Sequence, residues 1–160
     1  MAFFIRRISV PVYVVIILVA LQSNSLARQT KTVANKPLLS VYKTPTCGCC
    51  AKWVDHMKAN GFEAQVQDLQ DTSPIRAKLG VPDQLASCHT ARVGRYVIEG
   101  HIPAESVHRL LKERPTTVVG LAVPGMPMGS PGMEVPGGYK QPYAVLTFDR
   151  NGHTTVFERR

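Results

Sequence analysis

Three of the four cysteines, Cys47, Cys49 and Cys50, stand within four positions of one another, and Cys88 follows much later in the chain. Neighbouring cysteines rarely bridge each other without strain, so this spacing favours a metal site, or one redox pair with spare ligands, over an ordinary disulfide framework. Thiolates are soft ligands that suit copper(I) and zinc. The close cysteines are therefore predicted to form a metal site, or a redox pair with a spare ligand.

Cys47 and Cys50 also form a C-x-x-C pair between a short β-prone run, residues 38–42, and a segment with helical spacing. This order places the pair at a helix N-terminus, where the helix dipole and free N–H groups stabilise a thiolate and make it reactive. Cys47 and Cys50 are thus the predicted catalytic pair if the protein exchanges thiols and disulfides.

Met126, Met128 and Met133 lie in a segment rich in glycine and proline, residues 120–138, which offers them little apolar core. A thioether binds copper(I) and few other biological metals, so these methionines are further candidate ligands and favour copper(I). The alternative is that they are flexible surface filler.

His89 follows Cys88 directly and is a candidate ligand or proton carrier, although a histidine at this position can equally be a satisfied structural residue. The other histidines have no comparable neighbour and are not part of the predicted site. They are His56, His101, His108 and His153.

Strands and helices alternate along the first two thirds of the predicted domain. The patterns first predict a strand over 38–42, a helix from the cysteines to Asn60-Gly61, and a half-buried strand over 62–69. A short helix capped by Ser73 and a helical turn within 82–87 follow. The last two elements are a strand over 91–100 that is broken at Gly94, and a helix that begins at 102 and ends at Pro115. This β-α-β-α-β-α order indicates an α/β fold.

The rest of the chain is predicted to be a loop over 120–138 and a C-terminal β-hairpin. Residues 143–148 and 154–158 are β-prone and flank Asn151-Gly152, a strong hairpin signal. Residues 38–160 therefore make one domain.

The N-terminus has the layout of a secretory signal. Residues 1–7 carry two positive charges, and the apolar run 8–21 that follows is shorter than the roughly 20 residues of a membrane-spanning helix. Ser25-Leu26-Ala27 offers a cleavage site. We expect a signal peptide over 1–27 and a flexible lead over 28–37; the alternative is an uncleaved anchor, the only contact with a membrane that the sequence suggests.

The formal net charge is +8, and from Lys43 onward, after the predicted signal, the basic residues are scattered along the chain. A nucleic-acid binder would gather them on one face, so this class is disfavoured. No Ser-His-Asp order, phosphate-binding glycine loop or H-E-x-x-H helix is present in the sequence, which leaves hydrolase and nucleotide functions without support.

Four segments together resemble the CopG family of periplasmic copper-resistance proteins. They are TPTCGCC at 44–50, CHT at 88–90, EGHIPA at 99–104 and GLAVPGMPMGSPGME at 120–134. The resemblance implies a thioredoxin-like fold, a bacterial periplasmic location, and a small multinuclear copper cluster. Carried over residue by residue, Cys47, Cys49, Cys50 and Cys88 are the implied sulfur ligands. The segment 120–138, which contains Met126, Met128 and Met133 and is called the methionine loop below, would lie nearby.

Two other functions remain open. One is a thiol–disulfide oxidoreductase using the C-x-x-C pair, although Cys49 inside that pair would complicate two-thiol exchange. The other is a structural zinc site binding one ion. The expected partners are copper ions and other periplasmic copper-handling proteins.

Overall fold

A computed structural model describes residues 36–160, so the predicted signal peptide and nearly all of the predicted lead lie outside the described residues. The described part is built on a seven-stranded sheet with the order β2-β1-β3-β4-β5-β6-β7. The strands are β1 (Leu38–Lys43), β2 (Glu63–Asp68), β3 (His89–Val93), β4 (Tyr96–Glu99), β5 (Val118–Ala122), β6 (Ala144–Asp149) and β7 (Thr154–Arg159).

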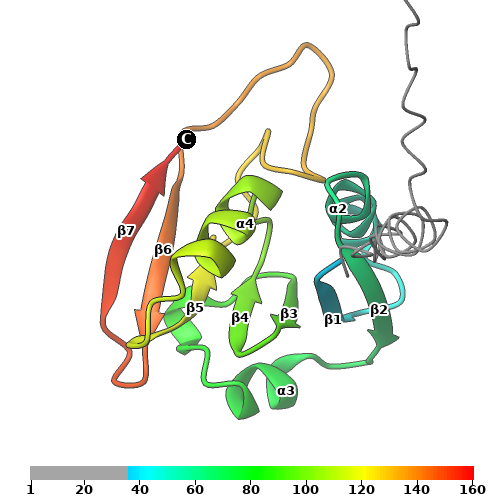
Figure 1. Cartoon of the computed structure of the whole chain (residues 1–160). Helices are drawn as coiled ribbons and strands as arrows, with labels where there is room; N and C mark the ends of the chain where they lie inside the picture. The colour runs from blue at the N-terminus through cyan, green and yellow to red at the C-terminus, as the bar shows by residue number, and fades with distance from the viewer. Residues whose placement is uncertain (1–35) are drawn as a thin grey trace, which may run out of the picture. The chain divides into compact units, whose positions relative to one another are not determined.

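Within residues 36–160, three α-helices and one short 3₁₀ turn accompany the sheet. They are α2 (Gly48–Ala59), α3 (Ser73–Lys78), α4 (Ala104–Glu113) and the turn η1 (Asp83–Leu85). In Figure 1, α4 lies in front of β5, α2 lies next to it above β1 and β2, and α3 lies at the lower edge. Within residues 36–160, none of the helices combines the length and the apolar character that crossing a membrane requires.

The sheet is mixed. β1 pairs in parallel with β2 and antiparallel with β3, while β4 pairs antiparallel with β3 and in parallel with β5. Its two faces carry two separate apolar cores. Trp53 and Met57 of α2 and Val107 and Leu110 of α4 pack on one face. Val81 and the residues around it pack on the other face, so the sheet is covered on both sides.

The predicted single strand over 91–100 is wrong, because the chain reverses at Gly94. Gly94 has φ of 56°, a left-handed conformation that glycine adopts without strain, and Val93 pairs with Tyr96 across the turn. Two antiparallel strands, β3 and β4, therefore replace the one that was predicted.

Residues 120–122 were predicted to belong to the loop, but they form the end of strand β5. Gly120 lies against β4 so closely that a Cβ atom there would collide with the carbonyl oxygen of Val97. In the sequence this glycine suggests a loop, but in the structure it allows the backbones of two strands to approach closely.

Two smaller predictions are corrected. β2 is almost entirely exposed rather than half-buried, because it is an edge strand, and only Ala64 within it is partly buried. Helix α3 has Thr72 rather than Ser73 at its N-cap, with Ser73 as the first helical residue.

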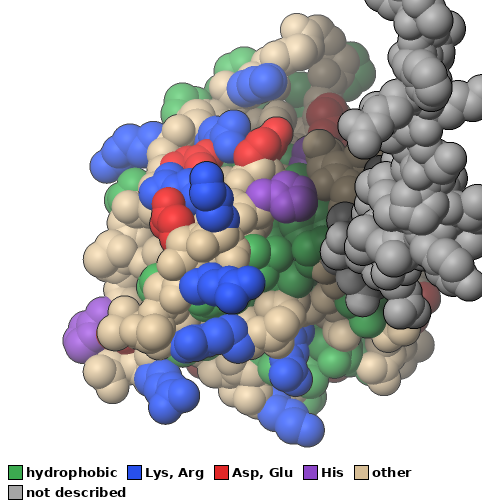
Figure 2. Space-filling model, viewed as in Figure 1, with side chains coloured by type: hydrophobic (Ala, Val, Ile, Leu, Met, Phe, Trp, Pro, Cys, Tyr) green, Lys and Arg blue, Asp and Glu red, His purple; other side chains and the backbone are tan. Residues whose placement is uncertain are grey.

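The remaining predicted elements are confirmed. They are the strand after residue 38, the helix that follows the cysteines, the turn at 83–85, the helix that ends before Pro115 and the C-terminal hairpin of β6 and β7. The α/β class is confirmed, while the thioredoxin-like assignment stays a prediction. Figure 2 shows Lys and Arg side chains spread over the visible face, with Asp and Glu beside some of them.

Candidate metal centre

The three-cysteine segment forms the start of α2, as predicted. Cys47 is the N-cap residue, with an extended backbone, and its sulfur accepts a hydrogen bond from the backbone N–H of Cys50 at 3.3 Å. Cys49 and Cys50 lie in the first helical turn. The sulfurs therefore gather where the unpaired N–H groups of a helix favour negative charge.

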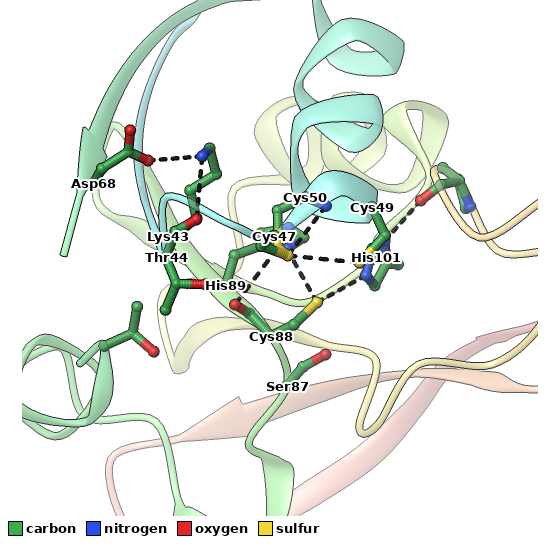
Figure 3. The surroundings of a disulfide bond; sticks show 12 residues. Lys43, Thr44, Cys47, Cys49, Cys50, Asp68, Ser87, Cys88, His89 and His101 are labelled. Atoms are coloured by element: carbon green, nitrogen blue, oxygen red, sulfur yellow. Dashed lines mark hydrogen bonds and ion pairs between the residues drawn. A yellow bond between two sulfur atoms is a disulfide. The ribbon is translucent and has the colours of Figure 1, made fainter. Parts of the chain in front are cut away.

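Cys88 joins this group through the pairing of β1 with β3. Lys43, the last residue of β1, is opposite His89, the first residue of β3. The segment that follows β1 thus meets the residue that precedes β3. The four cysteine sulfurs all lie within 4.8 Å of one another, and Figure 3 shows Cys88 next to the three cysteines of α2.

Cys47 and Cys50 are joined by a disulfide, with their Cα atoms 5.3 Å apart. Cys49 and Cys88 are free thiols, and the Cys49 sulfur lies 3.5 Å from that of Cys47. The arrangement is one redox pair with two spare sulfurs. Reduction of the disulfide would turn it into a group of four thiols.

The Cys88 thiol is strongly held in its protonated form. Burial, reinforced by repulsion from Cys49, raises the pKa of Cys88 to about 12. A thiolate at this position therefore needs a compensating cation, and a bound metal ion supplies one by displacing the proton.

His89 lies fully buried beside the sulfurs. Its ring contacts Trp53, with the ring centroids 4.3 Å apart, and its Nδ1 lies 3.6 Å from the sulfur of Cys88. Burial, with a smaller contribution from His101, lowers the pKa of His89 to about 3, so the ring stays neutral. Its Nε2 is the one buried side-chain N or O atom between residues 36 and 160 without a hydrogen-bond partner.

His101 belongs to the same group, and the prediction missed it. Its Nε2 lies 2.8 Å from the sulfur of Cys88, and its Nδ1 lies 2.8 Å from the carbonyl oxygen of Pro131. A carbonyl only accepts, so Nδ1 carries the proton and Nε2 presents its lone pair to Cys88. Burial lowers the pKa of His101, which also favours the neutral ring.

Sequence order hides this histidine. The antiparallel hairpin of β3 and β4 places Thr90 opposite Glu99, and this returns His101 to the beginning of β3. The available signal was the segment at 99–104 that contributed to the family resemblance.

The methionine loop passes over the N-terminus of α2, as Figure 1 shows for the segment between β5 and β6. A Cβ atom on Gly132 would lie 2.6 Å from the carbonyl oxygen of Cys49, so the loop backbone lies directly on the helix. The side chains of Met126 and Met128 are exposed and that of Met133 is partly buried. Their role as ligands stays a prediction.

The donor set is soft to intermediate. Cys88, His89 and His101 form a second close group, with their donor atoms within 4.8 Å of one another. Neither this group nor the cysteine group contains a carboxylate, the ligand that hard cations prefer. Sulfur and neutral imidazole instead suit copper or zinc, so the residues fit a soft or borderline metal.

Comparisons with known proteins agree with this site. Two solved structures, entitled "Copper resistance protein copG- Form 1" and "Copper resistance protein copG- Form 2", are each 38% identical to the chain, with a TM-score of 0.73. Each comparison covers 78% of this chain and 98% of the other. The chain belongs to the CopG family.

A protein-family model described as "Protein of unknown function, DUF411" matches residues 85–133. This CopG-family chain thus has Cys88, both site histidines and the loop methionines inside the matched segment, and the three cysteines of α2 outside it. No curated protein matches the chain. The predicted family is confirmed, and the chain is a homologue of a copper resistance protein with a cysteine cluster able to hold metal.

Proposed function

We propose that this chain is an exported, periplasmic copper(I)-binding protein that serves copper resistance by sequestering the ion or handling its oxidation state. The observation that carries the proposal is the meeting of four cysteine sulfurs from two distant segments within 4.8 Å, in a homologue of a copper resistance protein. The β1-α2-β2 and β3-β4-α4 arrangement supports a thioredoxin-like description of the fold.

Charge favours several copper ions over one. Four thiolates in a partly buried group carry four negative charges, and a single Cu⁺ would leave most of that charge uncompensated at high cost. Several copper(I) ions, each bridged by thiolates, would offset it. One zinc ion in a four-cysteine site is the competing solution, and it differs in both metal and stoichiometry.

The disulfide defines the state that can bind. Reduction of Cys47–Cys50 by a dithiol, which gives up two electrons and two protons and becomes a disulfide, yields four thiols. Copper(I) then replaces their protons. The neutral rings of His89 and His101 can supply nitrogen ligands without competing for a proton.

The test is metal counting on reduced protein. Protein reduced with a phosphine, desalted and loaded with copper(I) without oxygen should hold more than one copper per chain, and Cys50→Ser should lose this multinuclear binding because a hydroxyl bridges soft ions poorly. Thr46→Ser, an exposed change in the same segment, should bind as the wild type does. Unchanged copper uptake by Cys50→Ser would remove Cys50 from the site.

A thiol–disulfide oxidoreductase is the second candidate, favoured by the Cys47–Cys50 disulfide at a helix N-terminus. One thiolate would attack a partner disulfide, and the other would then displace the partner's sulfur and re-form the bond. The same reduced preparation distinguishes the two functions. If the metal-free protein reduces a test disulfide, and the copper-loaded protein holds at most one metal ion per chain, the oxidoreductase is supported.

A further inference from the structure

A buried ion pair lies behind Cys88 and contributes no metal ligand. Glu99, at the end of β4, is fully buried, and the side chain of Arg76 in α3 is 12% exposed. Burying two charges is costly, and an apolar pair of similar size is often as stable. The contacts of this pair indicate what the charges are used for.

The ion pair holds both peptide groups of Ser87. The Glu99 Oε1 accepts from the Arg76 Nε at 2.9 Å and from the backbone N–H of Ser87 at 2.7 Å. The Arg76 Nη2 in turn donates to the carbonyl oxygen of Ser87 at 2.7 Å. The other Glu99 oxygen accepts from the hydroxyl of Thr90 at 2.6 Å, next to His89 in β3.

Ser87 immediately precedes Cys88 and lies outside any strand or helix, so no ladder partner fixes its backbone. Figure 3 shows Ser87 beside Cys88, with α2 on the opposite side. The carbonyl that Arg76 binds belongs to the peptide that joins Ser87 to Cys88. Charged groups therefore fix the backbone from which the fourth sulfur projects.

The same serine supports the methionine loop. The Ser87 hydroxyl donates to the carbonyl oxygen of Gly125 at 2.5 Å, and the N–H of Gly125 donates to the carbonyl oxygen of Ala86 at 3.4 Å. Gly100, with φ of 77°, makes room for this contact, because a Cβ atom there would lie 2.5 Å from the Ser87 hydroxyl. One serine thus connects the ion pair to Cys88 and to the start of the loop.

We propose that Arg76 and Glu99 are positioning residues, which hold Cys88 in place opposite the cysteines of α2 so that the site is assembled before metal binds. The proposal rests on the proposed copper function for its purpose, but its geometry can be tested without copper. A preassembled sulfur does not have to be ordered during binding, so affinity rises. Groups that orient metal ligands typically change metal affinity by about 10- to 100-fold.

The first test uses the oxidised, metal-free protein, in which Cys49 and Cys88 are the free thiols. Dibromobimane alkylates one thiol and then the second, releasing one bromide and one proton at each step, and becomes fluorescent when both have reacted. In the wild type the second step should be fast, because the two sulfurs lie within 4.8 Å. Glu99→Gln should slow the second step severalfold relative to the first.

The second test loads the reduced proteins with copper(I) and measures affinity by competition with a chelator, well below the unfolding temperature. Glu99→Gln should weaken binding by about tenfold or more. Glu113→Gln is the matched control, because it makes the same change in another Arg–carboxylate pair. That pair lies on the half-exposed face of α4, where the Glu113 Oε1 is 2.7 Å from the Arg109 Nε. It should behave as the wild type does in both tests.

If Glu99→Gln does not fold, the double variant Arg76→Met with Glu99→Leu gives the same comparison, because it removes both charges together. A folded variant that matches Glu113→Gln in cross-linking and copper affinity would overturn the positioning role, even if its unfolding temperature falls. A protein that binds no copper, but whose cross-linking depends on Glu99, would refute the proposed function and leave the positioning role standing.

Discussion

Burial sets the protonation of the donor atoms around Cys88. It raises the pKa of the Cys88 thiol and lowers the pKa of His89 and of His101, so at neutral pH all three groups are uncharged before metal binds. The two imidazoles are ready to coordinate, whereas the thiol must first lose its proton. Metal binding should therefore release protons and weaken as the pH falls.

We predict that His89 makes the metal-free protein sensitive to acid. The pKa of about 3 for folded His89 lies below its ordinary 6.5, so below pH 6.5 the unfolded chain takes up a proton that the folded chain does not. The contribution of His89 to the free energy of unfolding is therefore fully present above about pH 6.5. It decreases as the pH falls, by up to about 1.4 kcal/mol per pH unit.

Replacing His89 with Phe keeps an aromatic ring against Trp53 and removes this proton uptake. Denaturant unfolding at pH 7 and at about pH 4.5 should show a loss of stability smaller by roughly 2 to 3 kcal/mol in His89→Phe than in the wild type. His108→Phe, which changes an exposed histidine, should keep the wild-type acid sensitivity. Equal pH dependence in His89→Phe and the wild type would show that His89 is protonated in the folded state.

Residue types were enough to single out the four cysteines, and the structure brings their sulfurs together, while their role as metal ligands stays a prediction. They were not enough for His101. Its place depends on the turn at Gly94, which brings the end of β4 back to the start of β3, and the sequence pattern shows that turn only as a break in one strand. Glu99 was missed for the same reason.

At the scale of elements, the contact between the methionine loop and α2 determines how the site is covered. Gly132 has φ of 84°, and its missing Cβ would lie 2.6 Å from the carbonyl oxygen of Cys49 and 2.9 Å from the backbone nitrogen of Trp53. Both neighbours are helix backbone, which cannot move aside cheaply. Glycine at this position therefore allows the loop to lie on the helix.

We predict that Gly132→Ala lifts the loop from α2. The contact and the left-handed backbone together should cost more than about 1 kcal/mol, measured by denaturant unfolding. Because the loop covers the carbonyl of Cys49, alkylation of Cys49 in the oxidised protein should become faster.

Gly137→Ala separates the two causes. Gly137 has the same φ of 84° in the same loop, but nothing lies within 4 Å of its missing Cβ. Its alanine variant should show the backbone strain alone, with an unchanged rate of Cys49 alkylation. If both variants alkylate at the same rate, the loop does not depend on its contact with α2.

Periodicity predicted most elements, and two of the failures share one cause. β5 and the edge position of β2 follow from strand pairing across the sheet, which local sequence does not encode. Gly120 is the clearest example, since a residue that looks like a loop signal lies in a buried strand against Val97. The register of Lys43 with His89, which assembles the cysteines, is a long-range property of the same kind.

At the scale of the whole molecule, the site needs a compartment where both of its states can exist. The Cys47–Cys50 disulfide is stable outside the reducing cytosol, whereas the four-thiol state forms only with a reductant, after which bound copper(I) would keep the sulfurs reduced. Export is therefore part of the proposed function. The sequence features that predict export lie outside residues 36–160 and must be tested on the full chain.

We predict that the exported protein begins near Arg28. The basic residues 1–7, the apolar run 8–21 and Ser25-Leu26-Ala27 form a signal that a peptidase would cut after Ala27, because small side chains are required at that position. Intact-mass spectrometry of protein from the exported fraction should give the mass of residues 28–160. Ala27→Arg should block cleavage and keep residues 1–27 attached. Exported wild-type protein with the mass of all 160 residues would show instead that the apolar run remains as a membrane anchor.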